Sequence, residues 1–403
     1  MRRVERAGEQ RYGSSSARRS PALFRARARV VLGVALCLAL LAACTPDRAE
    51  VSWHEVTLPA PGAEGRVTVR DATRCGEEWL AVGGVWLAHP TADQDSTPAA
   101  WRSADGRDWQ PVAIHADTYW GQRALLTSVA CSDGRVTVIG ARAGGAHGIP
   151  RVTPFYLQGG ALEDVAVGYT LFGGENATNV GPMTGGPQWL IAGNRSSGPA
   201  FWTSTGQGEF TLHEGVPGLA NDAGFSALAQ AATWTGNGWL LVGAGSVPGV
   251  LDRVPLAWTS PDGETWQREE APGSDGFDDL QRVIATADGA LALGLLGDTF
   301  GAWRRTEDGW STPTPFGRLP STASKSPYVA SLTSDGDEFW ATTSDGASYS
   351  LWRSADGEDW QRVTPPAPPP EAGGEQLLAA AAAAGRVLLF SDDGESSRLW
   401  WTD

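Results

Sequence analysis

The sequence predicts an all-β fold, a seven-bladed β-propeller of four-stranded blades in which the N-terminal strand completes the last blade. The 403 residues include 51 glycines and 19 tryptophans but only two methionines. Such a composition favours short strands joined by tight turns. Closely similar segments flanked by aromatic residues recur along the chain, and their spacing of about fifty residues is the length of one propeller blade.

The most regular repeat is a hairpin that is centred on an Asp-Gly pair. Residues 101–109, 258–266 and 352–360 read WRSADGRDW, WTSPDGETW and WRSADGEDW. A diverged copy covers 202–210, and a shorter copy runs from 303 to 310. Asp-Gly supplies the positive φ angle of a tight turn, and the repeated serine and aspartate can bond the amides of that turn.

A short apolar strand precedes each hairpin, and seven copies of it occur, at 79–83, 136–140, 189–193, 239–243, 290–294, 339–343 and 387–391. In four copies the hairpin aromatic residue follows the strand end by nine residues. A further apolar stretch precedes each of these strands, so each unit reads as four strands. The alanine run 379–384 has high helix propensity, but its position in the repeat predicts an inner strand.

The chain ends one strand short of a complete last unit. Residues 399–403 match the start of the 351–360 hairpin, and there the sequence stops. Residues 52–56 (SWHEV) resemble the outer strand at 359–363 (DWQRV). We therefore predict that the strand of Trp53 joins the strand of Trp400 and closes a single propeller over residues 51–403. The least regular hairpin is that of the second unit, near 156–162.

The first 43 residues read as a lipoprotein signal peptide. An arginine-rich segment precedes the apolar run 30–40, and Leu-Ala-Ala-Cys44 follows with the pattern of a lipobox. We expect lipidation of Cys44, a short tether at 44–50, and a chain held by its lipid on the outer face of a bacterial cytoplasmic membrane. The alternative is an ordinary signal peptide with an incidental cysteine, and Cys37 is an incidental cysteine of that kind.

The exported part of the chain is strongly acidic. Nine of the 31 basic and two of the 46 acidic side chains precede Cys44, which leaves 22 against 44 and a net charge of −22. Such a surface repels nucleic acid and anionic lipid headgroups. We expect no nucleic-acid partner, membrane attachment through the lipid alone, and a monomer.

Two cysteines lie in the predicted propeller. Cys75 and Cys131 follow the inner strands of adjacent units at matching positions. Inner strands of neighbouring blades converge on the axis, and the extracytoplasmic compartment is oxidising. We therefore predict a Cys75–Cys131 disulfide, and the alternative is two small buried thiols.

The hairpins resemble the Asp-box, or BNR, repeats of sialidases and related propellers. The family pattern is Ser-x-Asp-x-Gly-x-x-Trp, and this chain has one residue fewer between Asp and Gly. The resemblance implies a structural role at the blade periphery for Ser103, Asp105, Ser260, Asp262, Ser354 and Asp356. Sialidase activity would need an arginine triad, a Tyr–Glu nucleophile pair and an acid/base aspartate. The string closest to the family's Arg-Ile-Pro segment is 148–151, which has Gly in place of Arg, so the resemblance implies the fold and not the activity.

The long loops suggest where a ligand could bind, since loops carry function more often than strands do. The segments 84–100, 141–155 and 244–257 exceed their counterparts in length and share one predicted face. With the connection between the first two blades, they give a candidate binding face of aromatic, basic, histidine and acidic side chains: Trp86, His89, Asp93, Asp95, His115, Tyr119, Trp120, Arg142, His147 and Arg151.

We predict no metal site and no cofactor. His89, His115 and His147 lack ligand-like spacing, and the acidic segment 274–279 is a weak alternative for Ca²⁺. No catalytic residue is predicted. The sequence thus favours a non-enzymatic binding scaffold for an envelope protein, glycan or small ligand. The alternative is a degenerate sialidase-like glycoside hydrolase or lyase with its active site on the propeller axis.

Overall fold

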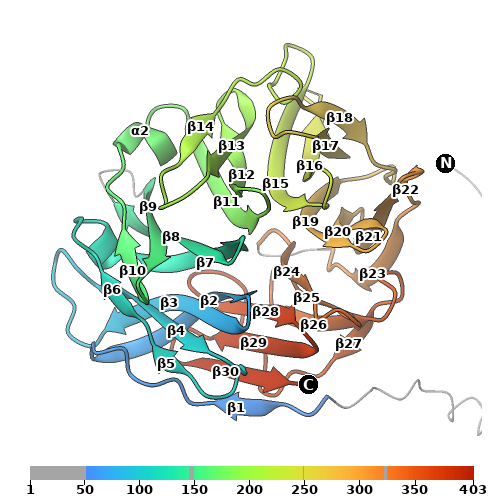
Figure 1. Ribbon diagram of the computed structural model, residues 1–403. Helices are drawn as coiled ribbons and strands as arrows, with labels where there is room; N and C mark the ends of the chain where they lie inside the picture. The colour runs from blue at the N-terminus through green and yellow to red at the C-terminus, as the bar shows by residue number, and fades with distance from the viewer. Residues whose placement is uncertain (1–50, 145–148, 248, 322–324) are drawn as a thin grey trace, which may run out of the picture. The chain divides into compact units, whose positions relative to one another are not determined.

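The computed structural model describes residues 51–403 apart from 145–148, 248 and 322–324. Within this part, seven sheets stand around a central axis as the blades of a β-propeller (Figure 1). The predicted fold class is therefore confirmed. The predicted signal peptide 1–43, the lipidation site Cys44 and the tether 44–50 lie outside the described residues.

The blades follow one another along the chain, and strands A to D of each blade run from the axis outward. Their bounds are as follows. Blade 1 contains β2 (Gly65–Cys75), β3 (Glu78–Leu87), β4 (Ser96–Ser103) and β5 (Gln110–Pro111). Blade 2 contains β7 (Leu125–Ser132), β8 (Arg135–Gly144), β9 (Ile149–Gln158) and β10 (Ala161–Asp164). Blade 3 contains β11 (Ala177–Gly185), β12 (Trp189–Arg195), β13 (Gly198–Ser204) and β14 (Thr211–His213). Blade 4 contains β15 (Ser226–Trp234), β16 (Trp239–Ser246), β17 (Val254–Ser260) and β18 (Gln267–Glu270).

The remaining three blades have these bounds. Blade 5 contains β19 (Asp278–Thr286), β20 (Gly289–Leu296), β21 (Thr299–Thr306), β22 (Gly309–Trp310) and β23 (Thr314–Arg318). Blade 6 contains β24 (Tyr328–Ser334), β25 (Phe339–Ser344), β26 (Tyr349–Ser354) and β27 (Gln361–Val363). Blade 7 contains β28 (Leu377–Ala383), β29 (Arg386–Asp392), β30 (Ser397–Thr402) and the N-terminal β1 (His54–Val56). The alanine run is thus an inner strand, as predicted.

The ring closes through the two ends of the described chain. β1 pairs antiparallel with β30, and Glu55 lies opposite Trp400. Trp53 packs edge-on against Trp340 of blade 6, with ring centroids 6.0 Å apart. The predicted pairing is therefore confirmed. It gives the last blade its outer strand and protects the edge of β30, which would otherwise be open to other chains.

The hairpin turns are held by their own side chains. Ser103 Oγ accepts the amide of Gly106 at 2.8 Å, and Asp105 Oδ1 accepts the next two amides at 2.9 and 3.1 Å. Gly106 has a φ of 75°, which favours glycine over any other residue. The 258–266 and 352–360 hairpins repeat these contacts. The amides hold the pKa of Asp105 below its ordinary value, so the predicted structural role is visible in its contacts.

Tryptophan side chains link blades 1, 3 and 5 to the connections that lead into them. Trp101, Trp202 and Trp303 occupy the same repeat position on strand C and are fully buried. Their indole N–H groups donate to carbonyls of the preceding connections, at Pro59, Leu171 and Pro272, over 2.7–2.9 Å. A buried indole usually finds such a partner, so these three blades fix the path of the chain that enters them.

The inner strands carry bulges that free backbone amides for contact with a neighbouring blade. A register shift interrupts β2, β7, β11, β15, β19 and β24 near the same position. Side chains accept the amides across blade boundaries: Asp71 from Val129 at 2.9 Å and Gln281 from Val329 at 2.7 Å. Ser128 and Ser331 make the same kind of contact. These hydrogen bonds fasten neighbouring blades close to the axis.

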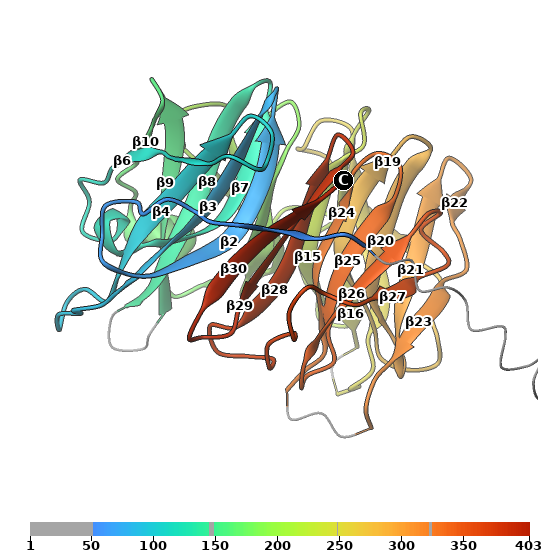
Figure 2. The ribbon, with the colours of Figure 1, turned by 90° about the horizontal axis from the view of Figure 1, so that it is seen from below.

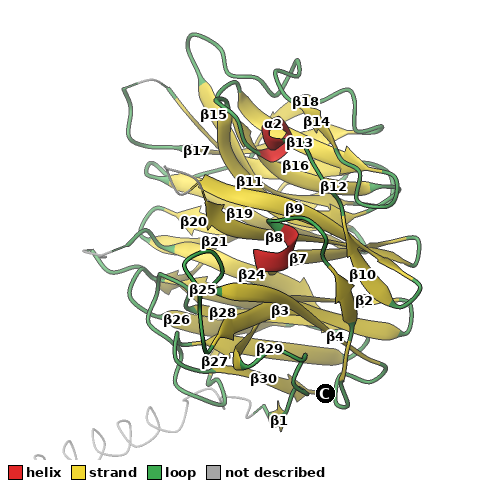
Figure 3. Ribbon diagram, turned by 90° about the vertical axis from the view of Figure 1, so that its left-hand side faces the viewer, coloured by secondary structure: helices red, strands yellow, loops and turns green. Residues whose placement is uncertain are grey.

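Two blades depart from the repeat. In blade 1 the outer strand β5 has two residues, and the chain then crosses to blade 2 as β6 (Ala113–His115), which pairs parallel with β10. In blade 5 the shorter hairpin gives only the two-residue β22, and β23 pairs with the rest of β21. In the described part of the chain, helices are limited to two short segments, η1 (Gly121–Arg123) and α2 (Tyr169–Phe172) (Figure 3). Among the described residues, no helix has the length and hydrophobicity to cross a membrane.

The predicted disulfide is present. Cys75 ends β2 and Cys131 lies near the end of β7, with Cα atoms 5.3 Å apart, so the bond joins blades 1 and 2. It closes a loop with a sequence separation of 56 residues.

We expect the double substitution Cys75→Ser and Cys131→Ser to lower the free energy of unfolding by about 2–4 kcal/mol, because the unfolded chain regains loop entropy. Denaturant unfolding of residues 51–403 would measure this change. A reductant should lower the stability of the wild-type protein by a similar amount and leave the double variant unchanged. Equal stability of the oxidised wild type and the variant would contradict the expectation.

Candidate functional site

The connections between strands B and C and those between successive blades project from one face of the propeller, which we call the loop face (Figure 2). The turns between strands A and B and between strands C and D lie on the opposite face, which we call the turn face. The loop face over blades 7, 1 and 2 carries the predicted binding residues. Two groups of side chains are organised there.

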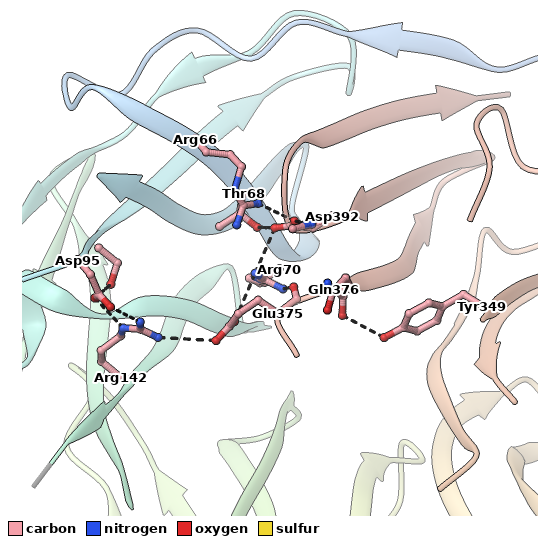
Figure 4. A network of polar contacts seen from close by, with 11 residues as sticks. Arg66, Thr68, Arg70, Asp95, Arg142, Tyr349, Glu375, Gln376 and Asp392 are labelled. Carbon is pink, nitrogen blue, oxygen red and sulfur yellow. Dashed lines mark hydrogen bonds and ion pairs between the residues drawn. The ribbon is translucent and has the colours of Figure 1, made fainter. Parts of the chain in front are cut away.

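The first group surrounds the buried carboxylate of Asp392, at the end of β29. Arg66 Nη1 lies 2.5 Å from its Oδ1, and Arg70 Nη2 lies 3.2 Å from its Oδ2 (Figure 4). Thr68 Oγ1 donates to Oδ2 at 2.6 Å. The Asp392 side chain is 0 % exposed, so its charge depends on these partners rather than on water. Three alternate residues of β2 thereby hold blade 1 against blade 7.

The same group extends to blade 2 through Arg142 on β8. Its guanidinium makes two hydrogen bonds to Asp95, at 3.0 and 2.5 Å, and lies 3.8 Å from Glu375. These contacts lower the pKa of Asp95 and raise the pKa of Arg142. Two cations lie near the Trp86 ring: the Arg142 guanidinium is 4.4 Å from its centroid and that of Arg66 is 5.7 Å away. We call Arg66, Arg70, Trp86, Asp95, Arg142, Glu375 and Asp392 the arginine–tryptophan cluster.

The second group lines a pocket of about 400 Å³ between β9 and the connection that carries α2. Arg151 lies over the Tyr169 ring at 4.3 Å and near Trp120 at 5.9 Å. Trp120 meets Tyr119 edge-on at 4.9 Å, and the Arg123 guanidinium covers Tyr119 at 3.6 Å. We call this cavity the Arg151 pocket.

The structure thus sorts the predicted residues into separate sites. Trp86 and Arg142 meet in the cluster, while Trp120 and Arg151 line the pocket. Tyr119 is exposed and packs on Trp120 outside the pocket lining. His115 lies 2.7 Å from Glu163, away from the cluster. His89 is exposed in the loop between β3 and β4, and His147 lies outside the described residues. Across the described ranges, no group of three or more His, Cys, Asp or Glu side chains could hold a metal ion. In the 274–279 segment, Asp278 accepts the amide and hydroxyl of Ser274 instead.

Four residues of the cluster were missed in the sequence. Arg66, Arg70, Glu375 and Asp392 are not among the residues that the sequence singles out. The usable signal was in β2, which carries three arginines, Arg66, Arg70 and Arg74, on an inner strand whose counterparts in the other blades are mostly apolar or small. Their partners lie more than 300 residues away, so sequence spacing could not pair them.

The propeller axis holds a channel of about 590 Å³ that is lined by strand A of all seven blades. Two aspartates near it have raised pKa values. Burial raises the pKa of both Asp71 and Asp279 to about 6. Asp71 accepts the amides of Ala72 and Val129, whereas Asp279 contacts Gln230 and Arg253. Asp71 of blade 1 thus bonds to blade 2, and Asp279 of blade 5 bonds to Gln230 and Arg253 of blade 4.

No protein-family model matches the chain, and no curated protein matches its sequence. Among solved structures, a streptogramin B lyase aligns with a TM-score of 0.51 and 11% identity, over 89% of this chain and 99% of that chain. The β-propeller domain of the Trilobed protease from Pyrococcus furiosus gives 0.46 and 11%, over 84% and 93%. Trypanosoma rangeli sialidase gives 0.40 and 11%, over 87% of this chain but only 59% of the sialidase. At 11% identity, the similarity to the lyase shows a common fold and nothing about function.

We expect Asp392→Asn to lower the free energy of unfolding by about 2–4 kcal/mol, because two partly buried arginines lose their counter-charge. Denaturant unfolding would measure the loss. Glu375→Gln is the matched control: its carboxylate is half-exposed and pairs with the same arginine, Arg70, so its removal should cost less than about 1 kcal/mol. Similar losses in the two variants would show that burial of Asp392 does not determine its contribution to the free energy of unfolding.

Asp71 should give the protein a measurable pH dependence. Its pKa is higher in the folded than in the unfolded state, so the folded state holds more protons between pH 4 and 6. The contribution of Asp71 to stability therefore falls as the pH rises through about 6. Asp71→Asn removes this titration, so the stability of the variant relative to wild type should rise between pH 5 and pH 7. Thermal unfolding at both pH values would measure it, and a constant difference would contradict the assignment.

Proposed function

We propose that this chain is an exported, lipid-anchored binding protein that recognises its ligand on the loop face over blades 7, 1 and 2, without catalysis. The tether is the lipid on Cys44, which follows from the lipobox and the basic, apolar leader. The propeller is a rigid support that holds the loop face outside the cytoplasmic membrane.

The observation that supports this function best is the arginine–tryptophan cluster. Tryptophan and arginine dominate the energetics of protein interfaces. Here Trp86 and Arg142 are already fixed by the cation–π contact and by Asp95, so binding would cost little side-chain entropy. The Arg142 side chain remains 18 % exposed and Asp95 49 %, which leaves both able to contact a ligand.

Binding without catalysis agrees with how the ionisable groups are used. Asp392 is enclosed by two arginines, and both oxygens of Asp71 accept backbone amides. Tyr349 donates to the carbonyl of Gln376, and burial raises the pKa of its hydroxyl. Each of these groups makes contacts that hold the fold together, which supports a structural use of these side chains.

A degenerate glycoside hydrolase or lyase that acts in the axial channel is the second candidate. The raised pKa of Asp71, which lines the channel, favours it, because general acids have pKa values near neutrality. Fluorogenic glycosides would test this candidate on residues 51–403. Turnover that disappears in Asp71→Asn would establish the enzyme and overturn a purely binding role.

Two measurements test the proposed function. In full-length chain expressed in a bacterium, Cys44→Ser should move the protein from the membrane fraction to the soluble fraction. For the binding face, immobilised residues 51–403 would be exposed to envelope extract from the source bacterium. A component captured by the wild type should bind at least about tenfold more weakly to Trp86→Ala and to Arg142→Ala.

The matched control is Arg107→Ala on the turn face. Arg107 lies over Trp401 at 4.2 Å, so this variant also removes an arginine from a tryptophan ring. Its capture should equal that of the wild type. Equal capture by all variants, or equal loss in the Arg107 variant, would rule out the loop face as the binding surface.

A further inference from the structure

The Arg151 pocket has walls that suit a flat apolar group. It is lined by Trp120, Tyr169 and Phe172 together with a set of aliphatic residues: Pro150, Val152, Val165, Ala166 and Val167. Its volume of about 400 Å³ lies within the range of pockets that hold small organic ligands. The pocket opens beside α2 and is separate from the arginine–tryptophan cluster.

Glycines fix the two aromatic rings. A Cβ atom on Gly144 would lie 2.1 Å from the Trp120 ring, so Trp120 packs directly on the backbone of β8. A Cβ atom on Gly173 would lie 2.6 Å from the Tyr169 ring. Both rings therefore occupy space that any other residue would fill. The pocket is shaped in advance, which lowers the entropic cost of binding.

One polar atom in this apolar pocket lacks a partner. Arg151 Nη1 is buried, and this atom has no hydrogen-bond acceptor among the described residues. The guanidinium also interacts with the Tyr169 hydroxyl, and this interaction lowers the pKa of Tyr169. A buried, unsatisfied guanidinium N–H is costly, and an anionic acceptor satisfies it best. The Arg151 guanidinium is also held over Tyr169, which presents it in a fixed orientation.

The acidic groups nearest in the chain are already occupied. Asp164 accepts the amides of Asp117 and Thr118 and the Thr118 hydroxyl, at 2.6–3.0 Å. Glu163 pairs with His115. Within the described ranges, Arg151 has no ion pair with a carboxylate. What distinguishes Arg151 is the combination of a buried, unpartnered Nη1 atom with a position in the wall of an apolar pocket.

We propose that the Arg151 pocket binds an aromatic carboxylate, with the ring against Trp120 and the valine wall and the carboxylate on Arg151. This inference rests on the proposed binding role of the loop face and names a ligand class for one part of it. Such a group occurs in free aromatic acids and at the end of a peptide with a C-terminal aromatic residue. The two sources share the chemistry that the pocket recognises.

Calorimetric titration of residues 51–403 with 2-naphthoate tests the proposal. We expect one site per chain, and at least about tenfold weaker binding of the neutral analogue 2-naphthamide, because the charge-assisted hydrogen bond is lost. Arg151→Gln should weaken naphthoate binding to a similar degree. Gly144→Ala should also weaken it, since the new methyl group displaces Trp120. Absence of naphthoate binding at millimolar concentration, or equal affinity for the amide, would overturn the proposal.

The matched control is Arg268→Gln. Arg268 lies over Phe225 at 4.7 Å in blade 4, so this variant removes a stacked arginine outside the pocket and should bind naphthoate normally. The comparison with the amide uses only wild-type protein and remains decisive if the Arg151 variant misfolds. Loss of binding in the Arg268 variant equal to that in the Arg151 variant would contradict the proposed site.

Two further experiments identify the source of the ligand and distinguish this proposal from the proposed function of the loop face. A short peptide with a C-terminal tryptophan would be compared with its amidated form. Preference for the free carboxylate, with affinity above that of naphthoate, would support a protein terminus as the ligand, and the reverse order would support a free acid.

Trp86→Ala should bind naphthoate normally. Naphthoate binding without face-specific capture from the envelope would leave the pocket valid and the cluster's role wrong.

Discussion

Closure of the ring by β1 and β30 is the interaction on which the rest of this structure depends. A single blade is a small twisted sheet with two apolar faces, and it buries them only against neighbours. The seven core clusters lie largely between pairs of adjacent blades rather than inside one. Pairing of Glu55 with Trp400 therefore completes the seventh blade and gives the first blade its second neighbour.

Closure also creates the arginine–tryptophan cluster. Asp392 and Arg66 are 326 positions apart in sequence, and they meet because the last blade lies beside the first. Asp392 in turn binds β2 through hydrogen bonds from Arg66, Thr68 and Arg70. Arg142 contacts both Glu375 and Asp95, so one network of charged side chains joins blades 7, 1 and 2. The same groups thus stabilise the closure and shape the surface that we propose for binding.

Departures from the repeat are what distinguish the loop face. In blade 1 the outer strand is short and the chain crosses to blade 2 as β6, and the following connection carries Tyr119 and Trp120 to the Arg151 pocket. The channel and the turn face are built instead from repeated elements, with serine–amide contacts between blades and Asp-Gly turns at the rim. Repeated positions maintain the fold, and the irregular ones create local chemistry.

The sequence by itself determined the all-β class, the seven units, the Trp53–Trp400 closure, the Cys75–Cys131 bond and the strand at 377–383. Each of these follows from a local pattern that recurs at a fixed spacing, so comparing copies reveals it. The sequence also selected Trp86, Arg142, Trp120 and Arg151. It wrongly placed Trp86, Arg142 and Arg151 in long loops, because strands β3, β8 and β9 extend further toward the loop face than the repeat predicts. Only the tertiary structure showed that these residues form two sites, and that Arg66, Arg70, Glu375 and Asp392 belong to one of them. Contacts between blades join residues from distant repeats, and no periodicity within the chain specifies which side chains meet across a blade boundary.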